Sequence, residues 1–389
     1  MNVADKKKQH YVPQFYLRNF SWGEKRLPIK LFNIHRGEYF TAGNLKGQCY
    51  EDYFYGKDLV IEKMFETLEG RVSPIIDRIT GGGVPPVRYS VDHDALLTFV
   101  LFQYGRTKHA GEAADEQVDR FAKAVLAKDE RIEPEHLDAV KISLKNPFAL
   151  TLKAVSHSVP LVHDLGIKVA VNRTPIRFVT SDHPVVFYNQ YAEEREIRSN
   201  TGFASRGLQI FYPVSPYHMV VLYDEAIYKI GGRKATSVDV TSVTDVQQLN
   251  DLQWLNALEN VYFDNTQPLN EIDRGSQRNT LRRNREKTIV KESEPTVGAD
   301  GRVSSIVMVA KPEPKVGLRL EFLKCLKAMP DEERTFGGLL VRDPDRVAIH
   351  QEFLKAVDKG GYKASEFGRF VLDHQAARSR ATPYGTTTR

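Results

Sequence analysis

Apolar residues first recur at helical spacing between residues 59 and 80, where they occupy every third or fourth position. This spacing places them on one face of an amphipathic helix that packs against a core. Three consecutive glycines, Gly81 to Gly83, end the helix. The segment from residue 95 to about residue 127 is apolar nearly all round in its first half, which predicts a central buried helix. A further helical segment, from 134 to about 162, is interrupted by Pro147 and Pro160.

A second pattern, in which apolar and polar residues alternate, predicts β-strands. Residues 28–35 alternate in this way and a turn leads into residues 39–40, so a hairpin is expected. Residues 246–261 return to helical spacing, and a strand at 303–310 is followed by amphipathic helices at 318–329 and 349–357. Short apolar runs typical of further strands lie at 166–171, 176–180, 185–188, 208–214 and 218–223.

These elements predict an α+β fold. A helical core over residues about 59–160 packs on a mainly antiparallel sheet, and a small C-terminal α/β module follows. The composition is globular, with 41% hydrophobic and 10% aromatic residues among 389. We find no run of eighteen apolar residues and no apolar segment near the start, so we expect a cytoplasmic protein with no membrane partner. Cys49 and Cys325 are too far apart for a disulfide framework or a Cys-based zinc site.

The positive charge is concentrated in residues 274–291, although the formal net charge of the chain is only +5. A local excess of Arg and Lys can bind phosphates, so this stretch is a candidate nucleic-acid interface. The alternative is a solvated linker or helix face, because the stretch lacks interleaved aromatic residues. The candidate contact residues are Arg278, Arg282, Arg283 and Arg285.

The N-terminal stretch from Gln9 to Phe20 is dense in aromatic and apolar residues, whereas chain ends are usually polar and frayed. We therefore expect this stretch to dock on the rest of the protein. Docking would hold His10 in a fixed place, with Pro13 stiffening the turn, as a functional histidine requires. The alternative is that His10 only hydrogen-bonds a carbonyl of the core.

Charged residues lie at the edge of the predicted helical core. Glu62, Glu66 and Glu69 form one stripe beside the apolar face of the first helix, and carboxylates one turn apart suit a divalent cation or an acid–base pair. The alternative is a plain acidic helix surface. Gln103 and Arg106 stand where the apolar run of the next helix ends. Because a buried charge needs a partner, Arg106 either pairs with one of the glutamates or is held ready for an anionic ligand.

The tetrapeptide Ser181-Asp182-His183-Pro184 directly follows a predicted strand, at a sheet edge where catalytic groups are common. Asp182 and His183 could be metal ligands, or a base and the group that orients it. Alternatively, Ser181 or Asp182 hydrogen-bonds its own turn. We find no phosphate-binding glycine loop, no His-x-x-x-His pair and no nucleophile elbow, which argues against the commonest nucleotide-binding and serine-hydrolase signatures.

Two of these segments carry a family resemblance. Residues 8–13 (KQHYVP), with the apolar positions that follow up to Phe20, resemble the opening signature of the domain of unknown function 4238 family, which is widespread in bacteria. Residues 180–185 (TSDHPV) resemble a second signature of that family, and weaker matches lie at 103–107 and 250–256. The resemblance implies candidate residues but no reaction.

The resemblance also suggests a division of the chain. We expect a family-like α+β domain over residues 1–268, a basic linker over 269–300, an accessory α/β module over 301–376 and a flexible tail over 377–389.

The first functional hypothesis is a hydrolase that uses a divalent metal (Mg, Mn or Zn), most simply a phosphodiesterase or nuclease, with a defence or toxin-like role in bacteria. We expect His10 and Asp182 to lie about one side-chain pair apart, with Arg106 or Glu66 lining the same cavity. The catalytic candidates are His10, Gln103, Arg106, Asp182 and His183, and the candidate metal ligands are Glu62, Glu66 and Asp182.

Two other hypotheses stay open. The chain could be a non-catalytic binding or sensor component of a multi-protein system, in which the two signatures fix the topology. It could also be a group-transferring enzyme that acts on a nicotinamide dinucleotide.

Overall fold

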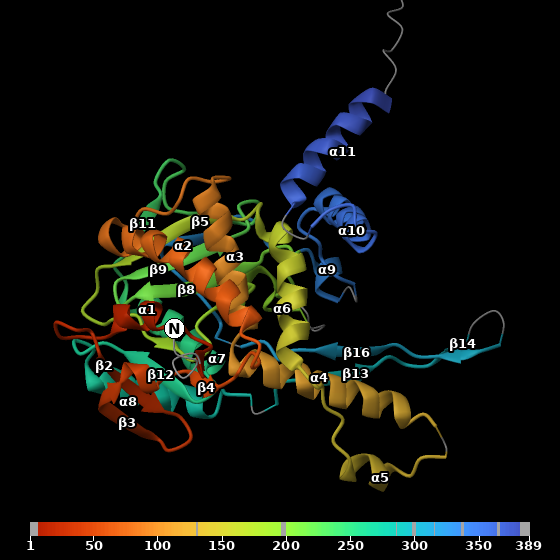
Figure 1. The fold of residues 1–389 in the computed structure, drawn as a ribbon, viewed down its shortest axis with the longest axis horizontal. Helices are drawn as coiled ribbons and strands as arrows, with labels where there is room; N and C mark the ends of the chain where they lie inside the picture. The colour runs from red at the N-terminus through yellow and green to blue at the C-terminus, as the bar shows by residue number, and fades with distance from the viewer. Residues whose placement is uncertain are drawn as a thin grey trace, which may run out of the picture.

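A five-stranded sheet forms the middle layer of the protein in the computed structural model (Figure 1). Its strands lie in the order β11-β5-β9-β8-β7, and all neighbours are antiparallel except β11 and β5. Their bounds are β5 (Gly166–Asn172), β7 (Val186–Tyr188), β8 (Gln209–Ser215), β9 (His218–Tyr223) and β11 (Ser237–Val240). The structure describes residues 7–129, 131–195, 200–284, 286–297, 301–314, 316–335, 338–363 and 366–381.

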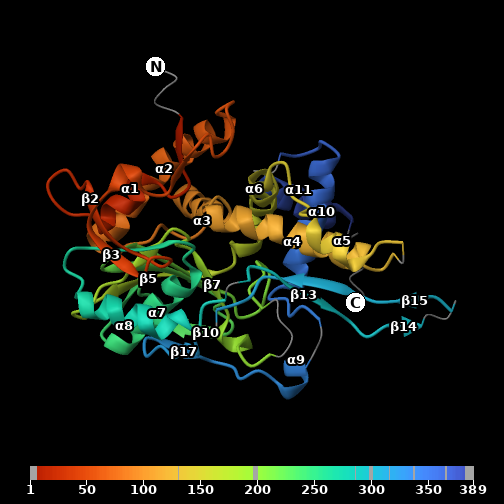
Figure 2. The ribbon, with the colours of Figure 1, turned by 90° about the horizontal axis from the view of Figure 1, so that it is seen from below.

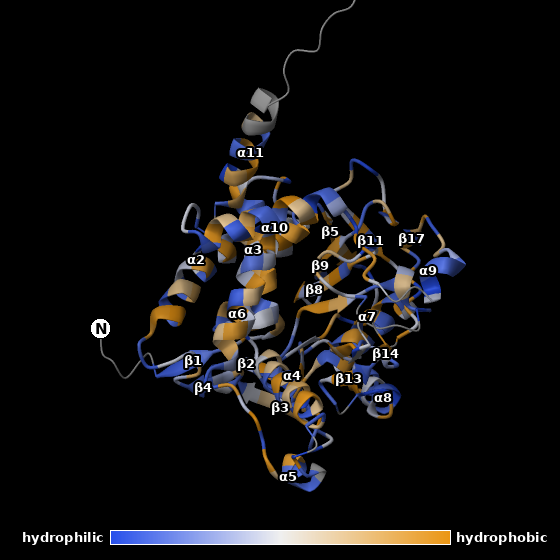
Figure 3. Cartoon of the chain, turned by 90° about the vertical axis from the view of Figure 1, so that its right-hand side faces the viewer, coloured by the Kyte–Doolittle hydropathy of each residue, from blue (hydrophilic) through white to orange (hydrophobic). Residues whose placement is uncertain are grey.

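Helices cover both faces of this sheet. On one face, Tyr212 and Val220 share a core cluster with α2 (Val60–Gly82) and α3 (Val91–Gly105). On the other face, Phe211 and Val221 pack with α7 (Val243–Asn256). Strands buried on both sides are nearly continuous in apolar residues, and β8 and β9 show mostly hydrophobic colours in Figure 3. The predicted α+β fold, with helices packed on mainly antiparallel sheets, is confirmed.

A four-stranded sheet lies beside the N-terminal segment. Its order is β3-β2-β12-β6, and the expected hairpin is its β2–β3 pair. The strand bounds are β2 (Pro28–Asn33), β3 (Glu38–Asn44), β6 (Thr180–Ser181) and β12 (Asn260–Phe263). The N-terminal stretch is docked, as expected, because Tyr16, Leu17 and Phe20 are completely buried. Its elements are β1 (Lys8–His10), which pairs with β4 (Tyr50–Asp52), α1 (Gln14–Leu17), and the 3-10 turns η2 (Arg18–Phe20) and η3 (Leu45–Gly47).

Two long predicted helices are shorter in the structure. The helix expected over 95–127 breaks after Arg106, because Thr107 takes an extended conformation and its hydroxyl accepts the N–H of Ala110, which begins α4 (Lys108–Leu126). The helix expected over 246–261 ends at Asn256, and residues 260–263 form β12 instead. The segment 134–162 divides into α5 (Pro134–Ala139), α6 (Pro147–Ser158) and the 3-10 turn η4 (Val159–Val162), while the predicted strand 176–180 is reduced to β6.

The stretch predicted as a basic linker contains regular structure. The helix α8 (Leu269–Thr280) packs against α7, where Gly275 contacts the Trp254 ring so closely that a Cβ would lie 2.5 Å from Nε1. Next, β13 (Ile289–Glu292) pairs with β16 (Val307–Ala310), and β14 (Thr296–Val297) pairs with β15 (Val303–Ser304). Figures 1 and 2 show this ribbon reaching away from the main body past α4.

The helix predicted over 318–329 is wrong. Leu318, Leu320 and Leu323 are buried in one cluster with apolar residues of α7, and β17 (Leu323–Cys325) pairs with β10 (Tyr228–Ile230). The remaining elements are η5 (Gln190–Ala192), α9 (Asp331–Thr335), α10 (Pro344–Asp358), which confirms the helix expected at 349–357, and α11 (Phe367–Ala381). Residues 382–389 of the expected tail lie outside the described residues. The division into domains stays a prediction. No helix in the described part of the chain is both long and apolar enough to cross a membrane.

Candidate functional site

The first signature is occupied by structural hydrogen bonds. The side chain of Gln9 is completely buried, and its amide accepts the backbone N–H of Tyr55 at 2.5 Å and donates to the carbonyl of Gly56 at 2.9 Å. These bonds hold the loop before α2 against β1. Gln9 therefore fixes the docked position of the N-terminal segment.

His10 lies half-buried next to this contact. Its Nε2 is 3.4 Å from the carbonyl oxygen of Lys46 and 3.1 Å from Nε2 of Gln14. Burial lowers the pKa of His10, and the carbonyl of Lys46 opposes that shift. Across the described residues, no hydrogen bond or ion pair joins His10 to Asp182, so the expected direct contact does not form. The contact with Lys46 matches the structural alternative for His10.

Gln103 and Arg106 form a buried chain of polar contacts. The carbonyl of the Gln103 amide accepts Arg106 Nε–H at 2.8 Å, and its NH2 group donates to the Tyr11 carbonyl at 3.0 Å. The Arg106 side chain is 1% exposed and its Nη1 pairs with Glu69 at 2.7 Å. Its guanidinium also lies 4.5 Å from the centre of the Phe65 ring. Arg106 thus takes the ion-pair alternative that the sequence left open.

The candidate metal ligands are divided between two places. Glu62 and Glu66 lie on α2, Glu66 exposed and Glu62 half-buried, and both have other interactions. Asp182 is 2% exposed and lies where β6 meets β12. Throughout the described residues, no group of three or more His, Cys, Asp or Glu side chains is placed to hold a metal ion.

Asp182 holds the turn between α7 and β12. Its carboxylate accepts the backbone N–H groups of Leu258 at 2.8 Å, Glu259 at 2.7 Å and Asn260 at 3.0 Å. Burial raises the pKa of Asp182 to about 6, although the three backbone hydrogen bonds lower it. These bonds replace the helical hydrogen bonds of residues 258–260, which explains why α7 ends early. They also set the position of Ala257 and Leu258, which line a pocket described below.

His183 links the second signature to the start of α4. Its side chain is 1% exposed, and Nδ1 is 2.6 Å from Thr107 Oγ1. This oxygen also accepts the N–H of Ala110, and it can either donate its own proton to Nδ1 or accept Nδ1–H with its second lone pair, according to the imidazole tautomer. The Nε2 atom of His183 is buried and has no hydrogen-bond partner among the described residues. Asn256 fixes the backbone here by donating to the carbonyl of His183 at 2.5 Å.

A second imidazole, that of His109, stacks on His183. The ring centroids are 4.4 Å apart and the planes are inclined by 13°. Burial lowers the pKa of His109 well below its usual value, and the charges of Lys311, Lys287 and Arg283 lower it further. Burial likewise lowers the pKa of His183, with His109 and Lys311 adding to the shift. Both rings are therefore neutral at about pH 7.

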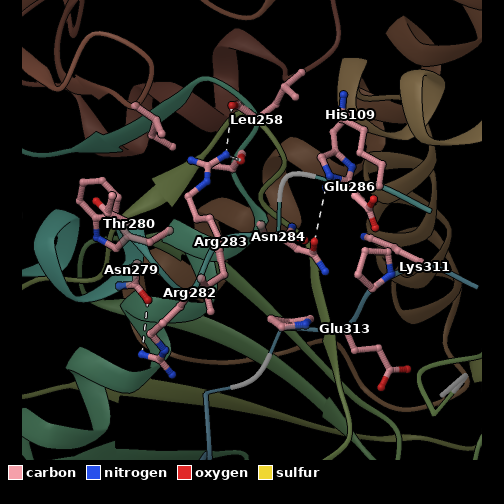
Figure 4. A pocket seen from close by; sticks show the side chains of 18 of the residues that line it. His109, Leu258, Asn279, Thr280, Arg282, Arg283, Asn284, Glu286, Lys311 and Glu313 are labelled. Atoms are coloured by element: carbon pink, nitrogen blue, oxygen red, sulfur yellow. Dashed lines mark hydrogen bonds between the residues drawn. The ribbon is translucent and has the colours of Figure 1, made fainter. Parts of the chain in front are cut away.

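His109 opens onto a pocket of about 710 Å³, which we call the cationic pocket (Figure 4). Its walls come from the end of β2, the start of α4, the end of α7, α8 with the residues after it, and the segment after β16. The residues that line it are Ile34, His35, His109, Trp254, Leu255, Asn256, Ala257, Leu258, Ser276, Asn279, Thr280, Arg282, Arg283, Asn284, Glu286, Lys287, Lys311, Pro312, Glu313 and Pro314.

Two cations of this pocket have no carboxylate partner among the described residues. Arg283 Nη2 donates to the carbonyls of Ala257 at 2.7 Å and Leu258 at 3.3 Å, while its Nη1 is buried without a partner. Lys311 Nζ lies 5.1 Å from the centre of the Tyr104 ring. A buried donor without an acceptor is costly, by about 1–3 kcal/mol, unless a ligand or water satisfies it. The pocket is therefore arranged to accept an anionic group.

The other charged lining residues have partners. Arg282 pairs with Asp251 at 3.3 Å, Lys287 pairs with Glu112, and Glu286 lies 3.5 Å from Arg120. Glu313 accepts the backbone N–H groups of residues 200 and 201. Glu313, like Arg283, has backbone partners and no ion pair among the described residues, so its negative charge offsets one of the two cations Arg283 and Lys311 and the remaining charge is positive.

The predicted nucleic-acid residues have different environments. Arg278 donates to the buried carboxylate of Asp251 at 2.9 Å, as Arg282 does at 3.3 Å, so the two arginines share a single negative charge. Arg283 lines the pocket with an unbalanced charge. Arg285 lies outside the described residues.

Sequence reasoning missed His109 and Lys311. His109 follows the weakly matching residues 103–107 by two positions, which was a usable signal. Lys311 comes from beyond the region of resemblance, and nothing in its local pattern marked it.

A protein-family model described as a protein of unknown function, DUF4238, matches residues 8–267 of the chain. Neither the curated proteins nor the solved structures yield a significant match. The matched region contains the two signatures and His109, whereas all of α8 and the segment with Lys311 follow it.

Proposed function

This chain belongs to the DUF4238 family of unknown function, and we propose that it is a phosphodiesterase acting on nucleic acid, with the cationic pocket as its substrate site. The observation that carries this proposal is the pair of cations without carboxylate partners, Arg283 and Lys311, on the walls next to His109. Arginine and lysine are the usual side-chain ligands of phosphate groups.

In this proposal His109 moves the proton. It is neutral at about pH 7, so it can accept a proton from a water molecule that attacks phosphorus. The new bond joins the water oxygen to phosphorus, the bond between phosphorus and the leaving oxygen breaks, and the proton on His109 passes to that oxygen. Arg283 and Lys311 then balance the negative charge that develops on the phosphoryl oxygens.

Glu62, Glu66 and Asp182 do not make a fitting ligand set, because the buried carboxylate of Asp182 already accepts three backbone hydrogen bonds. Dependence on added Mg, Mn or Zn is instead a separate arm of the experiment.

The test is cleavage of labelled single-stranded and double-stranded nucleic acid by the full chain, with chelator and with each metal in turn. We expect His109→Gln, Arg283→Gln and Lys311→Gln each to lower the rate at least about tenfold, since removal of one group that stabilises a transition state typically costs this much or more. Lys234→Gln is the matched control, because Lys234 is exposed in the turn between β10 and β11. The proposal is overturned if no condition gives cleavage, or if the three pocket variants cleave at the wild-type rate.

A specific observation favours a second function, a binding or sensor component. The polar groups of the first signature, Gln9 and the partners Gln103 and Arg106, are occupied by structural contacts. A protein of this kind would bind nucleic acid through Arg283 and Lys311 and leave it uncut. Binding that is lost in the pocket variants, without cleavage in any condition, would favour this function over the hydrolase.

A further inference from the structure

We infer that the cationic pocket receives a single unpaired nucleotide, with its phosphate at Arg283 and Lys311 and its base on the apolar part of the lining. This inference deepens the proposed function and rests on the same site. It names the substrate class as a single strand and not a duplex.

The concave shape of the pocket favours an unpaired base. At about 710 Å³ the pocket falls in the range of small-ligand sites, about 300–1,000 Å³, and is enclosed by segments from five parts of the chain. A base within a duplex is paired and stacked, and it must leave the stack before it can enter a concave site. A single strand does not incur this unpairing cost.

The lining of the pocket is both apolar and cationic, which suits a base together with its phosphate. A site for inorganic phosphate alone would need only the charged residues. Contact of a base with apolar side chains removes apolar surface from water, and this stabilises a bound base whatever its identity. The apolar lining residues are Ile34, Trp254, Leu255, Ala257, Leu258, Pro312 and Pro314.

The placement of polar groups gives the ligand an orientation. In Figure 4, His109, Glu286 and Lys311 lie on one side of Arg283, and Thr280 lies on the other. Asn284, next to Arg283, uses its side-chain oxygen to accept the N–H of Glu286 at 3.4 Å. Its NH2 group has no partner among the described residues and can donate to a base edge or a sugar oxygen.

The experiment measures binding to the full chain by fluorescence anisotropy. The probe is a short labelled oligonucleotide, either single or annealed to its complement, in chelator. The competitors are a nucleoside 5′-monophosphate, the matching nucleoside and inorganic phosphate. We expect the single strand to bind at least about tenfold more tightly than the duplex, because a paired base must leave the stack before it can enter the pocket. The monophosphate should compete at least about tenfold better than the nucleoside or inorganic phosphate, since it alone contacts both the cationic and the apolar lining residues.

Matched variants distinguish the contribution of the cationic lining residues to binding from that of the apolar ones. Arg283→Gln and Lys311→Gln should each make the slope of log K against log salt shallower by about 0.7, the value for one phosphate contact with a single strand. Leu255→Ala should weaken the nucleotide but leave inorganic phosphate unchanged, because Leu255 lies on the apolar wall outside the core clusters. Lys234→Gln should alter none of these values.

Equal binding of duplex and single strand, equal competition by phosphate and monophosphate, or an unaffected Leu255→Ala variant would each overturn the inference. These outcomes are distinguishable from failure of the hydrolase proposal. Tight single-strand binding without cleavage refutes only the hydrolase, whereas cleavage with equal affinity for duplex refutes only the unpaired-nucleotide site.

Discussion

His109 and His183 stack with ring centroids 4.4 Å apart, and this contact joins the second signature to the cationic pocket. His183 is hydrogen-bonded to Thr107 through Nδ1. The pKa of His109 is lowered by burial and by the positive charges of Lys311, Lys287 and Arg283. A positive charge on either ring would be repelled by these cations and by the other imidazole if that were also charged. Both rings are therefore neutral at about pH 7 in the free protein.

The first prediction concerns the pH dependence of binding. A bound phosphodiester offsets the cations that lower the pKa of His109, so the pKa of His109 is higher in the complex than in the free protein. Protons are then taken up on binding, and affinity should rise as pH falls through the pKa of the complex toward that of the free protein. The measurement is the Kd of a non-titrating phosphodiester probe between about pH 8 and pH 5.

His109→Gln should remove this slope. His35 also lines the pocket but is exposed, so His35→Gln is the control and should keep the slope. If the slope is lost in His35→Gln and kept in His109→Gln, then His35 and not His109 takes up the proton, and the prediction is wrong.

The second prediction is that Arg106 is structural. Arg106→Ala leaves Glu69 without its partner and empties the space beside Phe65, so unfolding should become easier by about 3–5 kcal/mol. Chemical denaturation measures this, and a cycle with Glu69→Gln should give a coupling of about 0.5–3 kcal/mol. Arg71→Ala, an exposed position on the same helix as Glu69, should change stability by less than about 0.5 kcal/mol. A well-folded but inactive Arg106→Ala protein would point to a functional role instead.

The third prediction concerns the contact between α8 and α7. A Cβ at Gly275 would lie 2.5 Å from Trp254 Nε1, so Gly275→Ala must push the helices apart. We expect a loss of about 1–3 kcal/mol in stability and weaker ligand binding, because Trp254 and Ser276 line the pocket. In Gly70→Ala the new Cβ meets nothing within 4 Å, so that variant should be up to about 1 kcal/mol more stable. Thermal and chemical unfolding of both variants measures the change in stability. Equal effects of the two substitutions would contradict the packing argument.

The fourth prediction uses a histidine far from the pocket. His93 is completely buried in α3, and both of its ring nitrogens lack hydrogen-bond partners among the described residues, although Nδ1 lies 3.9 Å from the Asp94 carboxylate. Burial lowers the pKa of His93 to about 4 from the usual 6.5. The neighbouring His163 and Arg88 lower this pKa further, whereas Asp94 raises it. The unfolded chain therefore binds a proton more readily than the folded one between these two values.

Stability should consequently be full above about pH 6.5 and fall toward about pH 4, with His93 contributing about 1–3 kcal/mol of the change once solvent screening is included. His93→Gln should show a correspondingly shallower decline in the free energy of unfolding over this range. His136→Gln, at a surface position in α5, is the control and should follow the wild type. A decline in His93→Gln as steep as in the wild type would refute the assignment.

Local pattern was enough to identify several parts of this protein. The apolar periodicity of residues 59–80 and the alternation of residues 28–40 predict α2 and the β2–β3 hairpin, because the apolar face of each element must be buried. The dense N-terminal stretch predicted a docked segment for the same reason. The mainly antiparallel α+β fold follows from the order of these elements, and the two signature segments were sufficient to suggest the family.

The tertiary structure decided the rest, because hydrogen-bond partners and pocket walls come from residues distant in sequence. Asp182 ends α7 by accepting N–H groups 76 to 78 positions away, which no local helix signal contains. Arg106 pairs with Glu69, and His109 shares a pocket with Arg283 and Lys311, which lie beyond the residues that the family model matches. Sequence determines which residue types are available and which faces must be buried. Only packing in three dimensions determines which charges are balanced and which are left facing a pocket.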